Sequence, residues 1–497
     1  MIKNPSPEQS IFFDWVVNGT GSCVLKAVAG AGKTSTIIHG TTLMKGDVFL
    51  GAYNKDIATE IKSKLGNSSV NVSTMHAAGL RAFRRVADPK VSSDKCRDIF
   101  REMTHRDMMA GVLEGPVLEL VSYAKQAAIG VGNSEKDKSV WMDLVTHFDV
   151  ETFNKRRDED CTEEILSLAL AVFNRSAQAC KHIIDFDDMI FAPLYFGVKF
   201  HKYDWVLLDE AQDTNRSRRL LALELMKPTS RLVAVGDPHQ AIYGFTGADA
   251  DSLDQIQAAT NATVLALSVT FRCPKAIVNY AHTWVNHIHA AESAPEGVLT
   301  HADIEQLTEV AKVGDTVLCR FNAPLIKYVY QFVAKGIPAR IQGREISAGL
   351  KNTVRRWKSK NLQDLLEKVK NFTEKEVKKY EQKEQGARAG MMQDRGDCIA
   401  VIIERVMQVD PKCKNPVERV VQEIDSIFGA EDDKKPHVQF SSIHRAKGRE
   451  WKRVIWLQTP PSAWAKQQWE LEQEMNLNYV GATRAMLELI LMQVPAK

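Results

Sequence analysis

Two acidic side chains at the end of an apolar run, Asp209 and Glu210, are the residues whose placement most clearly indicates chemistry. They follow residues 206–208, an apolar stretch typical of a buried strand, so both carboxylates leave that strand at one end. A carboxylate in this position can coordinate Mg²⁺ while its neighbour acts as a general base on water. The alternative is structural, because two acids also stabilise the N-terminus of a following helix.

A glycine-rich segment, AVAGAGKT at residues 27–34, favours the chemical interpretation. Glycines let backbone N–H groups close around phosphates, a lysine meets the β and γ charges, and a hydroxyl suits Mg²⁺. An apolar strand precedes the segment and a helical pattern follows it, although Ala27 replaces the usual first glycine. The predicted nucleotide-contacting residues here are Gly30, Ala31, Gly32, Lys33, Thr34 and Ser35, and the predicted Mg²⁺ ligands are Thr34 and Asp209.

Three polar side chains farther along the chain could complete a phosphoryl-transfer site. Gln240, in GDPHQ after another strand, can orient the attacking water or sense the γ-phosphate, because its amide both donates and accepts. Arg272 and Arg484 lie outside the first set of strands, and an arginine that neutralises charge on the γ-phosphate accelerates transfer by about 10³ to 10⁵. Arginines from a second domain would make hydrolysis depend on closure of a cleft, which converts chemistry into motion. The predicted catalytic residues are Lys33, Glu210, Gln240, Arg272 and Arg484.

The bulk composition restricts the class of protein. A chain of 497 residues predicts several domains, and 44% hydrophobic with 26% charged residues is ordinary for a globular protein. No apolar run approaches the roughly 18 residues of a membrane span, and the N-terminus lacks the pattern of a secretion signal, so we expect an intracellular protein with no membrane role. The eight cysteines show no CxxC spacing, and we expect reduced, mostly buried thiols.

Charge gives only local indications of a nucleic-acid partner, because the net charge is +3. Two basic clusters stand out, Arg81, Arg84 and Arg85 in one segment and Lys351, Arg355, Arg356, Lys358 and Lys360 in another. Each cluster by itself is equally typical of a solvated helix face.

The elements that must position these residues alternate between strand and helix. Strands are predicted at residues 21–29, 47–52, 205–208, 232–235 and 264–267, most of them followed by a polar turn, and a helix is predicted at 33–44. A second set of strands is predicted at 316–320, 339–342, 438–441, 453–457 and 487–491. This pattern predicts an α/β fold with parallel sheets and chemistry at the carboxyl ends of the strands. Between and within these sets lie helical segments without comparable strand signals, and FTEKEVKKYEQKEQGARAG at 372–390 fits one exposed helix with i,i+4 pairs.

The order of the motifs resembles a known family. PEQ, AVAGAGKT, VSTMH, DFDDM, DEAQDTN, GDPHQAIYGFTGA, FRCP, VLCRFNA, SSIHRAKGREW and YVGATRA follow one another as in the UvrD/Rep/PcrA branch of superfamily 1 helicases, with the likeness strongest to the compact F-box DNA helicase and phage-encoded relatives. The resemblance implies two RecA-like motor domains, each with a mainly helical insert. The implied boundaries are residues 1–85 and 180–265 for the first motor domain, 86–179 for its insert, 266–345 and 437–497 for the second motor domain, and 346–436 for its insert.

The resemblance also assigns binding roles. Gln9 would read the adenine edge, Phe271 would stack on the base and Glu450 would contact the ribose. The implied single-stranded DNA contacts are Tyr53, Asn54, Thr74, His76, Tyr243, Phe245 and His444. The family usually has IYRWRGA where this chain has IYGFTGA, so Phe245 replaces a tryptophan and the following arginine is lost, which weakens the expectation for base stacking and for ATP–DNA coupling.

The resulting functional hypothesis is an ATP-dependent single-stranded DNA translocase and helicase with 3′ to 5′ polarity, using ATP and Mg²⁺. Its expected partners are single-stranded and tailed duplex DNA, with recombination or replication proteins as further candidates, and we expect it to act as a monomer. The expected location is the cytoplasm or nucleoid of a bacterial host, with a phage gene as one source, and the family implies DNA repair or recombination. Two alternatives are an ATPase that removes proteins from single-stranded DNA with little unwinding, and an unrelated P-loop kinase or small-molecule ATPase.

Overall fold

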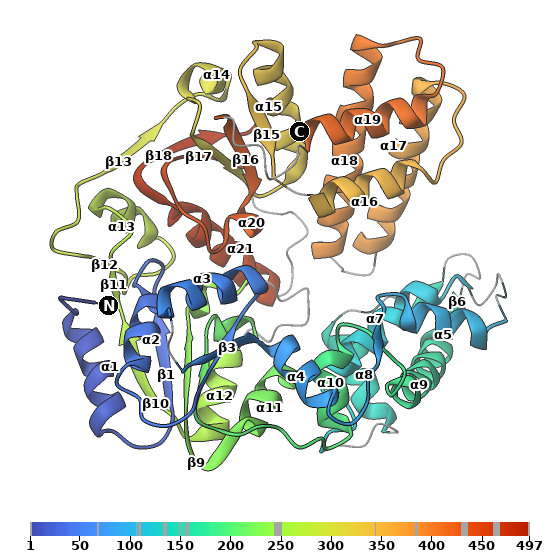
Figure 1. Cartoon of the computed structure of the whole chain (residues 1–497). Coiled ribbons are helices and arrows are strands. Elements are labelled where there is room, and N and C mark those ends of the chain that lie inside the picture. The colour runs from blue at the N-terminus through green and yellow to red at the C-terminus, as the bar shows by residue number, and fades with distance from the viewer. Residues whose placement is uncertain are drawn as a thin grey trace. The chain divides into compact units, whose positions relative to one another are not determined.

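The structure is a computed structural model that describes residues 2–66, 69–105, 107, 111–132, 137–148, 150, 152–154, 159–242, 251–342, 344–382, 386–428, 436–460 and 468–495. The chain forms two compact units. The first comprises residues 1–27 and 32–267, and the second comprises 28–31 and 268–497. Each unit contains one large parallel sheet (Figure 1).

The first unit is built on a six-stranded sheet with the order β10-β1-β9-β8-β2-β3, in which every neighbouring pair is parallel. Its strands are β1 (Cys23–Ala27), β2 (Val48–Ala52), β3 (Asn71–Thr74), β8 (Tyr203–Leu208), β9 (Met226–Gly236) and β10 (Thr263–Leu267). Most positions of β1, β2 and β8 and residues 232–236 of β9 are apolar and buried, as expected where helices cover both faces of a parallel sheet. The predicted α/β fold is confirmed, but β3 escaped prediction because its four residues are mostly polar.

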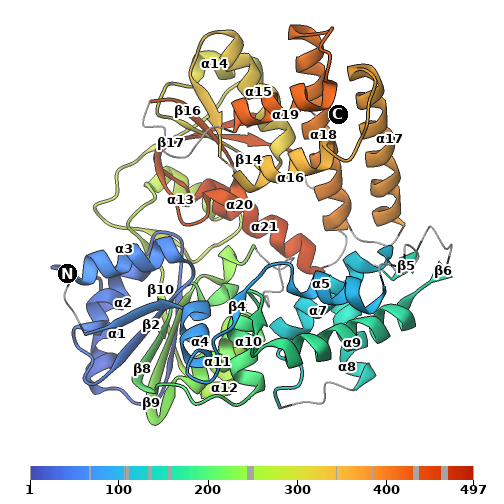
Figure 2. The same ribbon diagram turned by 45° about the vertical axis from the view of Figure 1, so that its right-hand side comes forward.

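Helices follow the strands of this sheet, and Figure 2 shows them on either side of it. They are α1 (Pro7–Asn18), α2 (Lys33–Thr41), α3 (Lys55–Leu65), α4 (Met75–Phe83), α10 (Asp188–Tyr195), α11 (Arg216–Glu224) and α12 (Ser252–Thr260), with short 3₁₀ turns at Ala211–Asp213 and Pro238–Gln240. Helix α2 ends three residues before the predicted Met44.

The first helical segment has its own apolar core, which is distinct from the core on the sheet. Its helices are α5 (Lys95–Met103), α7 (Glu114–Gln126), α8 (Lys138–His147) and α9 (Thr162–Ala179). Short strands that the sequence analysis did not predict also occur here. Strand β4 (Lys90–Val91) pairs with β7 (Ile183–Ile184), and β5 (Phe153–Asn154) pairs with β6 (Glu159–Asp160). Two-residue strands have no periodicity that a sequence pattern can reveal.

A cluster of buried charges joins these helices to α10. Lys95 Nζ lies 2.6 Å from Asp188 Oδ2, and both side chains are fully buried. Lys125 Nζ lies 2.8 Å from Asp188 Oδ1 and 2.5 Å from Asp185 Oδ2. Removing one partner from such a cluster leaves a charge that neither water nor a counter-ion compensates.

The second unit contains a six-stranded parallel sheet with the order β13-β18-β17-β14-β16-β15. Its strands are β13 (Val298–His301), β14 (Thr316–Cys319), β15 (Ala339–Ile341), β16 (Val438–Ser442), β17 (Trp451–Gln458) and β18 (Ala485–Gln493), and β11 (Val269–Thr270) pairs with β12 (His289–Ala290). Its helices are α13 (Lys275–Ala281), α14 (Leu307–Val310), α15 (Asn322–Ala334), α20 (Ile443–Ala446) and α21 (Gln468–Ala482), and a further group comprises α16 (Arg344–Val354), α17 (Leu362–Glu381), α18 (Gly386–Val409) and α19 (Pro416–Ile427).

Helices α16 to α19 share one continuous apolar core with the second sheet. The same cluster contains Phe440 and Ile455 from the strands and Leu365 and Ile402 from the helices. The half-buried carboxylate of Asp394 on α18 adds a polar connection, because it accepts hydrogen bonds from the backbone N–H groups of residues 322 and 323 at 3.0 and 2.7 Å. This helical group is therefore part of the same folded body as the sheet.

The prediction of one exposed helix at residues 372–390 was wrong. Helix α17 ends at Glu381 and α18 begins at Gly386. The Lys and Glu spacing remains helical beyond Glu381, so the charge pattern alone does not reveal where α17 ends. The one ion pair described inside the segment joins Lys379 and Glu376 at i,i+3 rather than i,i+4.

Two other expectations concern the chain as a whole. All eight cysteines are free thiols, and six of them are buried. Among the described residues, no helix is both long and apolar enough to cross a membrane.

We expect Lys95→Met to lower the free energy of unfolding by about 3 kcal/mol, because it leaves Asp188 buried with only one of its two cations. Urea unfolding measures the change. The matched control is Lys138→Met, whose ion pair with Glu163 is exposed, and it should cost under about 1 kcal/mol. Equal losses in both variants would contradict a special role for the buried cluster.

Candidate active site

The glycine-rich loop has the backbone of a phosphate site. Gly30 and Gly32 have φ angles of 72° and 76°, in a region of backbone conformation that residues with a Cβ rarely adopt. Helix α2 begins at Lys33, and no side chain caps its N-terminus. Its first backbone N–H groups therefore remain available for an anion.

Thr34 and Asp209 fit a Mg²⁺ ion. The Thr34 hydroxyl donates to Asp209 Oδ2 at 3.3 Å, so two oxygen ligands from different elements already face one point. Burial, and then the charge of Glu210, raises the pKa of Asp209 to about 7, while Lys33 acts in the opposite direction. A divalent cation at this point would supply the positive charge that a buried carboxylate lacks.

Glu210 is held in a strained backbone conformation. Its φ of 50° lies in the left-handed region, which is uncommon outside glycine and recurs at functional sites. Its Oε2 accepts a hydrogen bond from Gln212 Nε2 at 2.5 Å, and Gln212 Oε1 accepts from the backbone N–H of Asp237 at 3.1 Å. A Cβ at Gly236 would lie 2.3 Å from that Gln212 oxygen, so glycine is required there.

Gln212 is a site residue that the sequence analysis missed, although it stands inside DEAQDTN. It connects the loop after β8 with the loop after β9. There Gln240 is buried and donates from Nε2 to Asp237 Oδ2 at 2.6 Å. The structure thus links the predicted base, Glu210, to the predicted γ-phosphate residue, Gln240, through a short polar chain.

Gln9 has a structural role that leaves half of its amide available. In the capping box of α1, its Oε1 accepts from Ser6 N at 3.0 Å, and its Nε2 donates to Thr36 Oγ1 at 2.9 Å. An amide has two N–H donors and two acceptor sites, so one of each remains. That donor and acceptor pair matches the N6 and N7 edge of adenine.

In the second unit, the predicted nucleotide residues Phe271 and Glu450 are both solvent-accessible. The Phe271 ring is 54% exposed, as a stacking platform for a base must be. The Glu450 carboxylate accepts a hydrogen bond from Arg272 Nε. Residues 28–31 of the loop belong to this unit, and Gly30 O accepts from Phe271 N at 2.9 Å.

The two predicted arginines differ in how firmly they are held. Arg272 has an exposed salt-bridge partner, whereas Arg484 is 1% exposed. Arg484 donates from Nε to Val480 O at 2.9 Å and from Nη1 to Arg449 O at 3.2 Å. The buried Arg484 side chain is therefore anchored to the backbone of its own unit, whereas Arg272 is held by an accessible carboxylate.

Four of the predicted DNA residues lie where β2 and β3 end. Asn54 caps the N-terminus of α3, with Oδ1 accepting from Ile57 N at 2.9 Å, and Thr74 caps α4 in the same way at 3.2 Å. Tyr53 and His76 stand next to these caps. Burial and then the charge of Arg218 lower the pKa of His76 to about 4, so its imidazole is neutral at pH 7.

The other predicted DNA residues are placed differently. His444 lies in the second unit, at the start of α20, and burial followed by the charge of Arg320 lowers its pKa well below the usual value. Tyr243 and Phe245 lie outside the described residues. Phe186 in DFDDM is 61% exposed, and the sequence analysis gave it no role although an exposed ring beside two acids is an unusual signal.

The basic clusters are mostly on the surface. Arg84 and Arg85 are exposed. In the second cluster Lys351 pairs with Asp425 at 2.6 Å, whereas Arg355, Arg356, Lys358 and Lys360 are exposed. Exposure is compatible with both a solvated face and a nucleic-acid contact, so the alternatives of the sequence analysis stay open.

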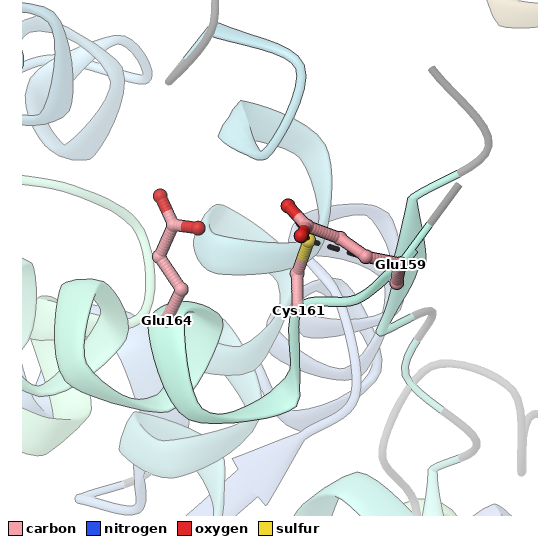
Figure 3. Close-up of side chains that lie close together, drawn as sticks. All are labelled: Glu159, Cys161 and Glu164. Carbon is pink, nitrogen blue, oxygen red and sulfur yellow. Dashed lines mark hydrogen bonds between the residues drawn. The ribbon is translucent and has the colours of Figure 1, made fainter. Parts of the chain in front are cut away.

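One group outside the nucleotide loop has metal-ligand atoms close together. Glu159, Cys161 and Glu164 place a carboxylate oxygen, a sulfur and a second carboxylate oxygen within 4.8 Å of one another (Figure 3). The Cys161 thiol donates to Glu159 Oε1 at 3.8 Å. The set mixes a soft ligand with hard ones and contains no histidine, and we assign no site to it.

A phosphate loop after one strand of a parallel sheet and an Asp–Glu pair after another define a P-loop nucleotide-binding protein. The comparison with known proteins then identifies the family. The UvrD/REP helicase N-terminal domain matches residues 12–261, and the UvrD-like helicase C-terminal domain matches residues 325–494. The chain belongs to the UvrD/REP helicase family, which confirms the predicted resemblance. The likeness to the F-box and phage-encoded relatives stays a prediction.

Individual relatives are more distant. The ATP-dependent DNA helicase PcrA of Staphylococcus epidermidis is 23% identical over 322 residues, which are 60% of this chain and 42% of that protein. The protein of the same name from Staphylococcus aureus is 22% identical over the same extent. The matched region thus spans less than half the length of these relatives.

We expect Asp209→Asn to raise the thermal unfolding midpoint at pH 8 in the absence of nucleotide and divalent metal. The pKa of Asp209 is raised from 3.8 to about 7 in the folded state, so the buried carboxylate destabilises the fold most above pH 7. The gain from asparagine should therefore shrink as the pH falls toward 4. The control is Asp204→Asn, because a hydrogen bond from Lys227 lowers the pKa of Asp204, and this change should not raise the midpoint. An unchanged midpoint for Asp209→Asn at pH 8 would contradict the prediction.

Proposed function

We propose that this protein is an ATP-dependent translocase and helicase on single-stranded DNA, with 3′ to 5′ polarity. The observation that carries the proposal is the convergence of Thr34 and Asp209 next to an uncapped helix N-terminus. Family membership supports DNA as the substrate, since the PcrA relatives are named DNA helicases.

The proposed hydrolysis uses groups that the loops of the first sheet position. The backbone N–H groups at the start of α2 and the Lys33 ammonium bind the phosphates. Thr34 and Asp209 hold Mg²⁺, which would neutralise phosphate charge. Glu210 takes the proton of the attacking water, and Gln212 fixes the direction of its carboxylate through the 2.5 Å bond.

The remaining roles are proposals with differing support. Gln240 senses the γ-phosphate and passes its state to Glu210 through Asp237 and Gln212, a chain that the hydrogen bonds support. Phe271 stacks on the adenine, which its exposed ring allows. The accompanying roles of Gln9 and Ser35 at the nucleotide, of Glu450 at the ribose, and of Arg272 and Arg484 at the γ-phosphate rest on the family resemblance.

For the DNA track, aromatic and neutral imidazole rings suit bases of any sequence. Stacking contributes about 1 to 3 kcal/mol per base without reading its identity. Tyr53 and His76 contribute from the carboxyl end of the first sheet, with Asn54 and Thr74 beside them. Phe186 joins them on the strength of its exposure, and Tyr243, Phe245 and His444 follow from the resemblance. Sequence-independent movement along one strand is the expected consequence.

The first test is the ATPase rate with and without single-stranded DNA. We expect strong stimulation in the wild type, loss of nucleotide binding in Lys33→Ala, and retained binding with turnover lowered at least about 100-fold in Glu210→Gln. Fluorescent nucleotide binding separates the two variants. Turnover unaffected by DNA would instead favour a small-molecule ATPase, and substantial hydrolysis by Glu210→Gln would remove Glu210 as the base.

The second test is strand displacement on duplexes with a 3′ or a 5′ tail. We expect unwinding of the 3′-tailed substrate, because a motor that moves 3′ to 5′ on the tail runs into the duplex. Preferential unwinding of the 5′-tailed duplex would overturn the polarity. Removal of a protein filament from single-stranded DNA without unwinding of either duplex would favour the second candidate, an ATPase that clears proteins from DNA. The altered IYGFTGA segment is the reason for considering this candidate.

A further inference from the structure

Arg218 stands between the candidate DNA residues and the catalytic loop. It is the third residue of α11, the helix that directly follows the DEAQDTN segment. Its backbone N–H donates to Asn215 Oδ1 at 3.1 Å, which fixes where the side chain starts. From there Nη1 donates to Asp213 O at 3.2 Å, and the guanidinium carbon lies 5.9 Å from the centre of the Tyr53 ring.

Neighbouring arginines on the same helix are committed to the fold, whereas Arg218 has capacity left. Arg216 donates to Ala127 O at 2.8 Å at the end of α7, and Arg219 is buried and donates to Thr214 O at 3.1 Å. A guanidinium has five N–H donors, and in the described part of the chain the side chain of Arg218 makes one hydrogen bond. Arg218 is half-buried, so its charge is only partly screened by water and remains accessible to a ligand.

Arg218 supplies a positive charge close to the side chains of Tyr53 and His76. Its charge contributes to lowering the pKa of His76 to about 4, so the imidazole stays neutral. Burial raises the pKa of Tyr53 to about 12, with Asp213 and Glu210 adding to the effect and Arg218 opposing it. Two neutral rings beside one cation match a nucleotide, whose base is apolar on its faces and whose phosphate is an anion.

The backbone connects Arg218 to the general base. The Asp213 carbonyl that accepts from Arg218 belongs to the 3₁₀ turn at Ala211–Asp213, and Asp213 N donates to Glu210 O at 3.0 Å. Glu210 has the strained φ of 50° at the other end of this turn. Two hydrogen bonds in series therefore join the Arg218 side chain to Glu210, the proposed general base.

We propose that Arg218 is a positioning residue that binds a backbone phosphate of the single strand and couples its presence to Glu210 through the Asp213 carbonyl. A guanidinium suits this role because it can bind a phosphate with two parallel N–H donors while another donor keeps its bond to the carbonyl. The phosphate is the same at every nucleotide, so the coupling does not depend on sequence. The inference rests on the proposed function, since it needs single-stranded DNA as the activator.

The experiment compares Arg218→Gln and Arg218→Lys with the wild type in an ATPase titration with oligothymidylate, each variant normalised to its own rate without DNA. We expect Arg218→Gln to raise the half-saturating DNA concentration about tenfold or more and to lower the maximal stimulation. Arg218→Lys keeps the positive charge but lacks the two parallel N–H donors of a guanidinium. Its half-saturating DNA concentration should therefore return toward the wild-type value, while the maximal stimulation stays low. In Arg218→Gln, the slope of log affinity against log salt concentration should become less steep by the amount expected for the loss of about one phosphate contact.

Lys199→Gln is the matched control, because Lys199 is exposed and precedes β8, at the amino end of the strands. It removes one positive charge and should leave half-saturation and stimulation at wild-type values. The inference is overturned if Arg218→Gln retains wild-type half-saturation and stimulation, or if its rates with and without DNA fall by one common factor, since that result means a structural role only. If DNA does not stimulate the ATPase rate of the wild type, the proposed function itself is contradicted. Direct binding of labelled oligothymidylate to the wild type and to Arg218→Gln then tests the phosphate contact alone.

Discussion

Parallel pairing of β1, β9 and β8 is the constraint on which the candidate active site depends. The three strands are neighbours in the first sheet, and parallel strands end at the same edge. The phosphate loop follows β1, Gln240 follows β9, and Asp209 with Glu210 follows β8. Segments separated by more than a hundred residues are thereby brought within hydrogen-bond distance, as the Thr34–Asp209 contact demonstrates. An antiparallel neighbour would place one of these loops at the opposite edge.

The site is assembled at a cost to the stability of the fold. Asp209 is buried without a direct cation partner among the described residues, and its raised pKa measures how unfavourable its charge is in that environment. Glu210 adds backbone strain. A cation bound beside Asp209 would offset the cost of its buried charge and would stabilise the fold.

The two helical segments differ in how they join the rest of their units. The first segment has an apolar cluster that is distinct from the cluster on its sheet and that includes Phe191 of α10, and buried ion pairs of Lys95 and Lys125 with Asp185 and Asp188 add to this connection. The second segment shares the apolar core of its sheet. Ion pairs require a defined geometry, whereas apolar packing tolerates small shifts, so substitutions at the ion pairs should be tolerated least.

The sequence by itself determined the α/β class, the two sets of strands, the phosphate loop and the acidic pair. Each of these is indicated by a short run of contiguous residues with a recognisable periodicity or spacing. It determined the family for the same reason. It missed β3, β13, the two-residue strands and the end of α17, where the local signal is short or the helical charge pattern continues past the end of the helix. Only the tertiary structure decided that Thr34 meets Asp209, that Gln212 binds the backbone of Asp237, and that Arg218 lies over the ring of Tyr53. These contacts join segments that are distant along the chain, and no spacing in the sequence encodes them.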